Sequence, residues 1–203
     1  MTLRPIFFDL ETTGVQSAQD RIVEIAAYDP WRDKKFQMLV FPKMKIPKEA
    51  MDIHGITDEM VANESPFEIV SEQFLQFCEG EVLLIAHNGE LFDFPFLAYE
   101  LRRAKKEIPH EWYGLDSLKW ARKYRKDLPR HSLQYLRQFF CIPENNAHRA
   151  LDDSYILWSV FSLMCDDLYC EEMVERGDGG RFQDLVQKTL KTIHKQTTEK
   201  ELF

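Results

Sequence analysis

The sequence lacks several features that would place a protein outside the ordinary globular class. Its four cysteines show no CxxC spacing, and Cys78 and Cys165 have apolar neighbours, so we expect buried free thiols rather than a zinc site or disulfides. No apolar run reaches the roughly 20 residues that span a membrane. Residues 1–5 lead into an apolar run without a signal-peptide pattern. These absences predict a cytoplasmic protein that makes no membrane contact.

An excess of positive charge is also missing, since the formal net charge is −8. Proteins with a broad duplex-binding surface are usually basic, so the acidity argues against one. Cations do gather locally, at residues 102–106 and 119–130. Each cluster is read either as a solvated helix face or as a phosphate contact for a single strand.

The 203 residues, 44% of them hydrophobic, suit one domain with a sizeable core. Short apolar runs predict strands at residues 4–10, 21–28, 35–41 and 82–86, the first three as an antiparallel meander. Helical spacing predicts helices at residues 66–78, 91–104, 115–123, 131–140 and 150–165. This order predicts a single α/β domain with a mixed β-sheet flanked by helices.

The pattern breaks near Gly177, Gly179 and Gly180, which suggests a division into residues 1–173 and 174–203 with a glycine hinge. After the glycines comes a short amphipathic helix, and then a polar tail from residue 195. Its apolar residues are Phe182, Leu185, Val186, Thr189, Leu190 and Ile193. Two alternatives stay open: a tether that docks in a partner's groove, or a helix packed on its own domain.

Asp9 and Glu11 lie two residues apart on a predicted strand, so their side chains share one face. Two acids inside an apolar strand are costly unless something neutralises them, and metal binding would do so. The alternative is an edge strand with one solvated face. The neighbouring Phe7, Phe8 and Leu10 argue against that alternative.

Asp93 follows the predicted strand at residues 82–86 and a short loop, near a helix start. Ligands tend to bind at the carboxyl ends of strands in α/β folds. An ordinary helix N-cap acid is the alternative.

His148 and Asp153 lie five residues apart, a turn of about 500° on a helix, so they cannot share a helical face. We therefore place His148 in the loop before the helix and Asp153 in its first turn, where an acid is favoured. The periodicity favours Asp153 over Asp152 as the inward acid. An ordinary surface histidine is the alternative for His148.

Four carboxylates and one imidazole are what a two-metal phosphodiester hydrolase needs. Hard cations such as Mg²⁺ prefer oxygen ligands. A histidine can take a proton from water near neutral pH.

The motifs together resemble the DEDDh (DnaQ-like) 3′→5′ exonucleases, a family that includes the proofreading subunit of bacterial replicative DNA polymerases. The resemblance rests on residues 9–14, 54–57, 87–93 and 148–153, and it covers about residues 4–168. It implies a ribonuclease H-like fold.

The resemblance also implies roles for individual residues. Asp9 would bridge two Mg²⁺ or Mn²⁺ ions, Glu11 and Asp153 would complete one site, Asp93 would hold the second ion, and His148 would be the general base. The substrate would contact Leu10, Thr12, Thr13, His54, Ile56, Asn88 and Phe92. The implied substrate is a single-stranded DNA 3′ end, and residues 174–203 would reach a DNA polymerase catalytic subunit.

Two rival functions remain at this point. The same chemistry could act on RNA, in tRNA trimming or oligoribonucleotide turnover, since discrimination depends on how the pocket treats the 2′-hydroxyl. A non-catalytic interaction module could also keep the fold, although the intact acids argue against it.

Overall fold

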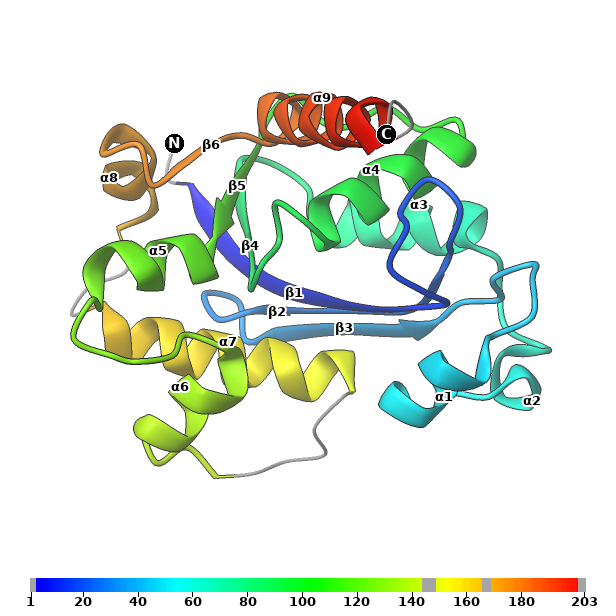
Figure 1. Cartoon of the computed structure of the whole chain (residues 1–203), viewed down its shortest axis with the longest axis horizontal. Helices are drawn as coiled ribbons and strands as arrows, with labels where there is room; N and C mark the ends of the chain where they lie inside the picture. Colours follow the sequence, from blue (N-terminus) through cyan, green and yellow to red (C-terminus); the bar gives the residue numbers. More distant parts are fainter. Residues whose placement is uncertain (1–2, 144–148, 166–168, 201–203) are drawn as a thin grey trace.

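The computed structural model describes residues 3–143, 149–165 and 169–200, with side chains described up to residue 191. These residues form a six-stranded sheet in the order β3-β2-β1-β4-β5-β6 (Figure 1). The strands are β1 (Arg4–Thr12), β2 (Ile22–Asp29), β3 (Lys34–Leu39), β4 (Val82–Ala86), β5 (Trp112–Asp116) and β6 (Gly179–Arg181). The first three strands form the expected antiparallel meander, and β4 and β5 run parallel to β1.

Helices cover both faces of this sheet (Figure 1). The helices are α1 (Lys48–His54), α2 (Asp58–Val61), α3 (Phe67–Phe77), α4 (Asp93–Arg103), α5 (Ser117–Tyr124), α6 (Leu133–Phe139), α7 (Ala150–Met164), α8 (Cys170–Glu175) and α9 (Phe182–Lys200). Within the part of the chain that the structure describes, every helix is too short or too polar to cross a membrane.

Alternation along β1 divides its side chains between two cores. Ile6, Phe8 and Leu10 pack with α3, α4 and α9, whereas Phe7 packs with α7 residues such as Phe161. Asp9 and Glu11 share the face of Phe7, so they point toward α7. The expected single α/β domain with a ribonuclease H-like sheet is confirmed.

The sequence-based prediction was wrong between residues 112 and 116. A helix was expected from residue 115, but residues 112–116 form β5, and α5 begins only at Ser117. Asp116 marks the change, because its carboxylate accepts hydrogen bonds from the backbone N–H groups of Leu118 and Lys119. This cap starts the helix two residues later than the apolar spacing suggests.

The glycine segment also differs from the expected hinge. Gly179–Arg181 pair with β5 as the edge strand β6. A Cβ on Gly179 would lie 2.7 Å from the carbonyl oxygen of Gly114, so the two strands approach more closely than other residues allow. Glycine at position 179 therefore permits close packing of β6 on β5.

The helix after these glycines is longer than predicted, because α9 continues to Lys200 through the expected polar tail. Its apolar side chains pack on the domain's own core: Phe182 and Val186 are buried there, and Leu185 and Leu190 lie partly buried beside them. The described apolar side chains of α9 thus lie against the domain, and a tether role for residues 174–203 stays a proposal.

Candidate active site

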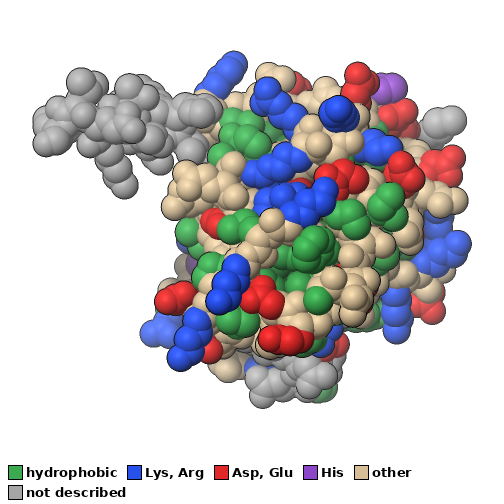
Figure 2. All heavy atoms as spheres, turned by 90° about the vertical axis from the view of Figure 1, so that its right-hand side faces the viewer, with side chains coloured by type: hydrophobic (Ala, Val, Ile, Leu, Met, Phe, Trp, Pro, Cys, Tyr) green, Lys and Arg blue, Asp and Glu red, His purple; other side chains and the backbone are tan. Residues whose placement is uncertain are grey.

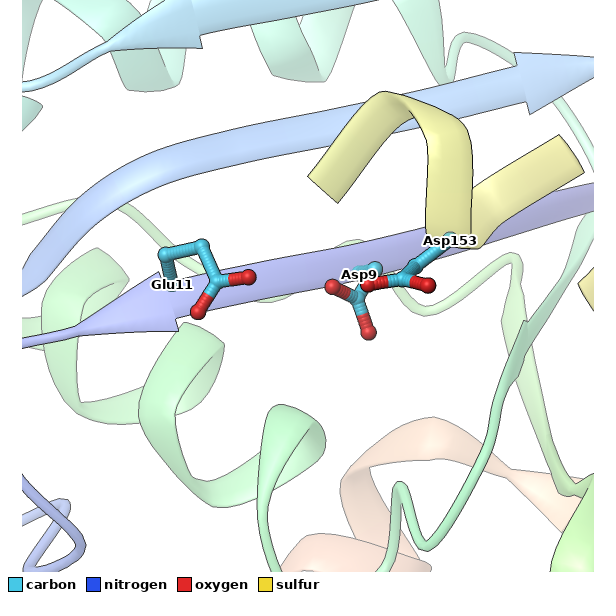
Figure 3. Close-up of side chains that lie close together, drawn as sticks. All are labelled: Asp9, Glu11 and Asp153. Atoms are coloured by element: carbon cyan, nitrogen blue, oxygen red, sulfur yellow. The ribbon is translucent and has the colours of Figure 1, made fainter. Parts of the chain in front are cut away.

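Three carboxylates meet where β1 passes under the first turn of α7 (Figure 3). Asp9, Glu11 and Asp153 each offer an oxygen, and these oxygens lie within 4.8 Å of one another. The strand spacing of two residues brings Asp9 and Glu11 to one face, and the start of α7 brings Asp153 onto them. Asp153 is buried and Asp152 only half-buried, so the expected inward acid is confirmed.

Asp93 lies close to this group but outside it. It is the first residue of α4 and only 2% exposed. Its charge raises the pKa of both Asp9 and Glu11. One of its oxygens, Oδ1, is buried and accepts no hydrogen bond from the described residues. The structure thus brings four of the five predicted catalytic residues to one place, while His148 lies outside the described residues.

The pKa values of these acids are pushed upward. Burial, followed by repulsion from Asp93, Glu11 and Asp153, holds the pKa of Asp9 well above its ordinary value. Burial and repulsion from Asp153 and Glu24 raise the pKa of Glu11 to about 8. For Asp93, burial also gives a pKa of about 8, even though the backbone N–H groups of Asp93 and Leu10 oppose the rise. Without a cation, the cluster favours protonated acids.

A pocket of about 450 Å³ continues from Glu11. It lies between the end of β1, the following loop and α1. Its lining includes four of the predicted substrate-binding residues, Thr12, Thr13, His54 and Phe92. It also includes Val15, Ala50 and Ile53, which the sequence did not single out. Val15 and Ile53 are 80% and 62% exposed, and such exposure of apolar side chains at a pocket rim is typical of a binding site.

Two predicted substrate-binding residues lie elsewhere. Leu10 is buried in the core on the face of β1 opposite to Asp9. Ile56 is fully buried with Val23, Ile46 and Val61. Its backbone N–H donates to His54 Nδ1, 3.0 Å away, so Ile56 supports the pocket through His54 rather than lining it.

Asn88 has a structural place beside the acids. Its φ of 68° lies in the left-handed region, which asparagine tolerates better than most residues. Its carbonyl oxygen accepts hydrogen bonds from the N–H groups of Leu91 and Phe92. Asn88 therefore shapes the turn that leads into Asp93.

Glu24 is a residue that the sequence analysis missed. It is fully buried, and it lies directly opposite Glu11 in the β1–β2 pairing. Its carboxylate accepts from Arg149 Nη2 at 2.9 Å and from the backbone N–H of Ala150 at 3.1 Å. Glu24 thus fixes the start of α7, and with it Asp153. The available sequence signal for Glu24 was its position between two apolar residues, Val23 and Ile25, on a predicted strand.

A second missed network fixes the loop that lines the pocket. Glu100 of α4 is 1% exposed, and it binds Arg21 through both carboxylate oxygens and Arg103 through one of them. Arg103 also donates to the carbonyl oxygens of Ser17, Ala18 and Asp20. The helix that begins with Asp93 therefore also holds the β1–β2 loop at its other end.

His87 has a structural rather than a chemical role. Burial lowers its pKa to about 4, so the ring is neutral near pH 7. The carbonyl oxygen of His131 can only accept, so His87 Nε2 carries the hydrogen and Nδ1 accepts from Ser117 Oγ. The ring ties the end of β4 to α5.

Comparison with known proteins identifies the family. The RNase_T exonuclease profile matches residues 6–161. The chain belongs to this exonuclease family. The resemblance to DnaQ-like exonucleases is thereby confirmed.

Two curated relatives are similar over most of this chain. The chloroplastic and mitochondrial exonuclease DPD1 of Arabidopsis thaliana is 41% identical over 82% of this chain and 57% of its own length. The DNA polymerase III subunit epsilon of Treponema pallidum is 39% identical over 77% of this chain and 74% of its own length. The chain thus spans little more than half of the plant protein.

Solved structures confirm the fold. The structure of E. coli exonuclease I with single-stranded DNA and zinc superimposes with a TM-score of 0.73 at 19% identity, covering 87% of this chain and 44% of that one. The cell-death related nuclease CRN-4 gives a TM-score of 0.67 at 19% identity, covering 81% of this chain and 64% of that one.

Proposed function

We propose that this chain is a divalent-metal-dependent 3′→5′ exonuclease of the DEDDh type. In this proposal it releases nucleoside monophosphates from single-stranded or frayed DNA 3′ ends. The observation that carries the proposal is the convergence of Asp9, Glu11 and Asp153 at the mouth of a pocket lined by Thr12 and His54. Membership of the exonuclease family supports it.

The acids fit a pair of hard cations. Every candidate ligand atom is a carboxylate oxygen, the donor that Mg²⁺ and Mn²⁺ prefer. The raised pKa values of Glu11 and Asp93, and the buried Oδ1 of Asp93, are features that a cation would relieve. We assign one ion to Asp9, Glu11 and Asp153, and the second to Asp9 and Asp93. When bound, such ions offset the charge that builds on the scissile phosphate and acidify the attacking water.

Residues around the pocket would bind and position the terminal nucleotide. Phe92, Ala50 and Ile53 give it apolar walls against which the terminal nucleotide would lie. The hydroxyls of Thr12 and Thr13 bond within the loop, to the carbonyl oxygen of Gly14 and to Asp20. Their part is therefore to hold the loop shape against the 3′ end. His148 is proposed to take the proton from the attacking water.

A time course on matched single strands tests the proposal. The substrates are a DNA and an RNA strand of one sequence, each labelled at the 5′ end, in Mg²⁺. The blank is Asp9→Asn, and the matched control is Asp152→Asn, which removes an acid from the same turn of α7 outside the cluster. We expect a DNA ladder that shortens from the 3′ end, is lost in Asp9→Asn and is kept in Asp152→Asn.

Other results would change the conclusion. A ladder on RNA alone would make the chain an exoribonuclease. No ladder on either strand, with a folded protein, would favour the interaction module. Equal loss of activity in Asp9→Asn and Asp152→Asn would show that activity does not depend specifically on the acid cluster.

His148→Ala separates proton transfer from binding. We expect turnover to fall about 10²–10⁴-fold, the usual contribution of a general base. The affinity for single-stranded DNA, measured by fluorescence anisotropy, should change little. Equal losses in turnover and affinity would contradict the assigned role.

A role in proofreading beside a DNA polymerase is the further part of this proposal. It is supported by the identity to a subunit epsilon. The apolar face of α9 is packed on the core, so a polymerase contact would use another surface of residues 174–203. Gel filtration with the polymerase catalytic subunit of the same organism tests it, and separate elution at micromolar concentrations would contradict it.

A further inference from the structure

The two basic clusters of the sequence each contain ion-paired cations and exposed cations that form no ion pair among the described residues. In the cluster at the end of α5, Lys119, Lys123 and Arg125 each form an ion pair, with Glu90, Asp178 and Asp127. At the end of α4, Arg103 and Lys106 are also paired, with Glu100 and Glu72. Arg102 and Lys105 are exposed there and have no ion-pair partner among the described residues.

Arg102 and Lys105 border a groove of about 570 Å³ between α4 and α9. Its lining combines apolar side chains, among them Ala98, Val186 and Leu190, with the aromatic ring of Tyr99. Cations that follow a backbone, beside an aromatic ring on which a base can stack, are the pattern of sequence-independent single-strand binding.

The lining of the groove carries a net positive charge although the whole chain is acidic. Three cations stand there against one acid: Arg102, Lys105 and Lys106 against Glu107. Figure 2 shows Lys and Arg side chains gathered in the upper half of this face, with some acids and hydrophobic side chains between them. A local excess of two positive charges attracts a polyanion.

The groove and the pocket at the acid cluster are separate cavities, and Arg103 connects the helix that borders one to the loop that lines the other. Arg103, between Arg102 and Lys105 in the chain, donates to the carbonyl oxygens of Ser17, Ala18 and Asp20. Asp20 lines the pocket beside Glu11. In Figure 1 the β1–β2 loop lies beside α4 on the same side of the molecule. A strand whose end occupies the pocket can therefore cross this loop and reach Arg102.

We propose that Arg102, Lys105 and the groove between α4 and α9 bind single-stranded nucleic acid upstream of the 3′ end held in the pocket. This inference rests on the proposed exonuclease function and adds an upstream binding site to it. Arg102 and Lys105 contact phosphates, and Tyr99 offers a stacking surface for a base.

The backbone conformation at Lys105 makes glycine a suitable replacement for testing this site. Its φ of 55° lies in the left-handed region at the end of α4, where glycine is the usual residue. Lys105→Gly therefore removes a cation without imposing backbone strain. Combined with Arg102→Gln, which keeps a good helix former in the last turn, it gives the double variant R102Q/K105G. The matched control, R122Q/K126Q, removes two exposed cations at the other cluster.

The experiment measures affinity by anisotropy on two labelled thymidine strands, one of about four and one of about fifteen nucleotides, since site sizes run from about 4 to 16 nucleotides per domain. We expect R102Q/K105G to weaken binding of the long strand about fivefold and to lower its salt slope by about 1.4, the value for two lost phosphate contacts. Binding and hydrolysis of the short strand should stay at the wild-type level, and R122Q/K126Q should match wild type on both strands.

Unchanged long-strand affinity and salt slope in R102Q/K105G would overturn the inference and leave the groove to a protein partner. Equal loss on short and long strands would overturn it as well, because the effect would then lie in the pocket. The binding measurement does not require hydrolysis. If the wild-type protein cleaves neither strand, and R102Q/K105G still loses affinity for the long strand only, the proposed function is refuted and this binding site is supported.

Discussion

Buried carboxylates in this molecule are neutralised in two different ways. Glu24, Glu100 and Asp29 each lie against an arginine, at distances of 2.9, 2.5 and 2.6 Å. Asp9 and Glu11 on β1 form no ion pair with a cation among the described residues, and their pKa values are raised. These three arginine-paired acids each fix a structural element, whereas Asp9 and Glu11 remain uncompensated at the place where we propose that metal ions bind.

Asp9→Asn should give the largest effect in this comparison. Loss of the carboxylate that both ion sites share should lower exonuclease turnover at least about a hundredfold. The same change should raise the melting temperature of the metal-free protein, because it removes a carboxyl whose pKa is raised by burial and by repulsion from Asp93, Glu11 and Asp153. Thermal unfolding in EDTA measures it. A lower melting temperature in EDTA would show that the cluster is not strained by its own charge.

Glu100→Gln should act in the opposite direction on stability. It leaves Arg21 and Arg103 facing an amide, and both guanidinium groups are partly exposed, at 17% and 27%. We expect a loss of about 3 kcal/mol in the free energy of unfolding, the low end for a broken buried pair. Urea denaturation measures it. A stabilised Glu100→Gln protein would remove the distinction between the two groups of acids.

The site was largely predictable from sequence because its key acids depend on local geometry. A spacing of two on a strand placed Asp9 and Glu11 together, and helix periodicity chose Asp153 over Asp152. The arginine-paired acids were not predictable in this way. Glu24 meets Arg149 across 125 residues, and Glu100 meets Arg21 across 79, so only the tertiary fold brings them together.

Two strands of the sheet were missed where local signals were ambiguous. Strands β5 and β6 are short, and both contain glycine, whose common reading is a turn or linker. Gly179 is required by the close approach of β6 to β5, whereas a Cβ on Gly114 would lie 3.0 Å from the side chains of Phe94 and Leu185. No single segment of the sequence reveals either contact.

The pH dependence of stability sharpens the comparison further. The folded protein holds a proton on Glu11 up to a pKa of about 8, against an ordinary 4.5. The contribution of protonated Glu11 to the stability of the fold is therefore complete below about pH 4.5, and it is lost as the pH rises toward 8. The melting temperature of the metal-free protein should fall across this range.

Metal ions should reverse that fall. Mn²⁺ at a hundred times its dissociation constant should add about 2.7 kcal/mol near pH 8. The gain should be much smaller near pH 5, where protons compete for the same oxygens. Calorimetry at both pH values, with and without Mn²⁺, measures it. An equal gain at both, or none, would contradict metal binding by these acids, and Asp9→Asn serves as the control with a reduced gain.

Asp116 is a third kind of buried acid, because backbone N–H groups rather than an arginine satisfy its carboxylate, and its variants should give the smallest effect. Its Oδ1 accepts from the N–H groups of Asn88, Leu118 and Lys119, and its Oδ2 accepts from Glu90 N–H. Asp116→Ala should cost about 1–2 kcal/mol, as the loss of a helix cap does. Asp116→Asn keeps the Oδ1 acceptor and should recover most of that.

The same pair of variants separates capping from charge. The charge of Asp116 helps to raise the pKa of Asp93, so both changes should lower that pKa and move the onset of activity to lower pH. Activity–pH profiles of the two variants, beside urea denaturation, measure both effects. If Asp116→Asn were as unstable as Asp116→Ala, the Oδ2 bond to Glu90 or the charge itself would carry the stability. If the pH profile of Asp116→Asn matched wild type, the charge of Asp116 would have no influence on Asp93.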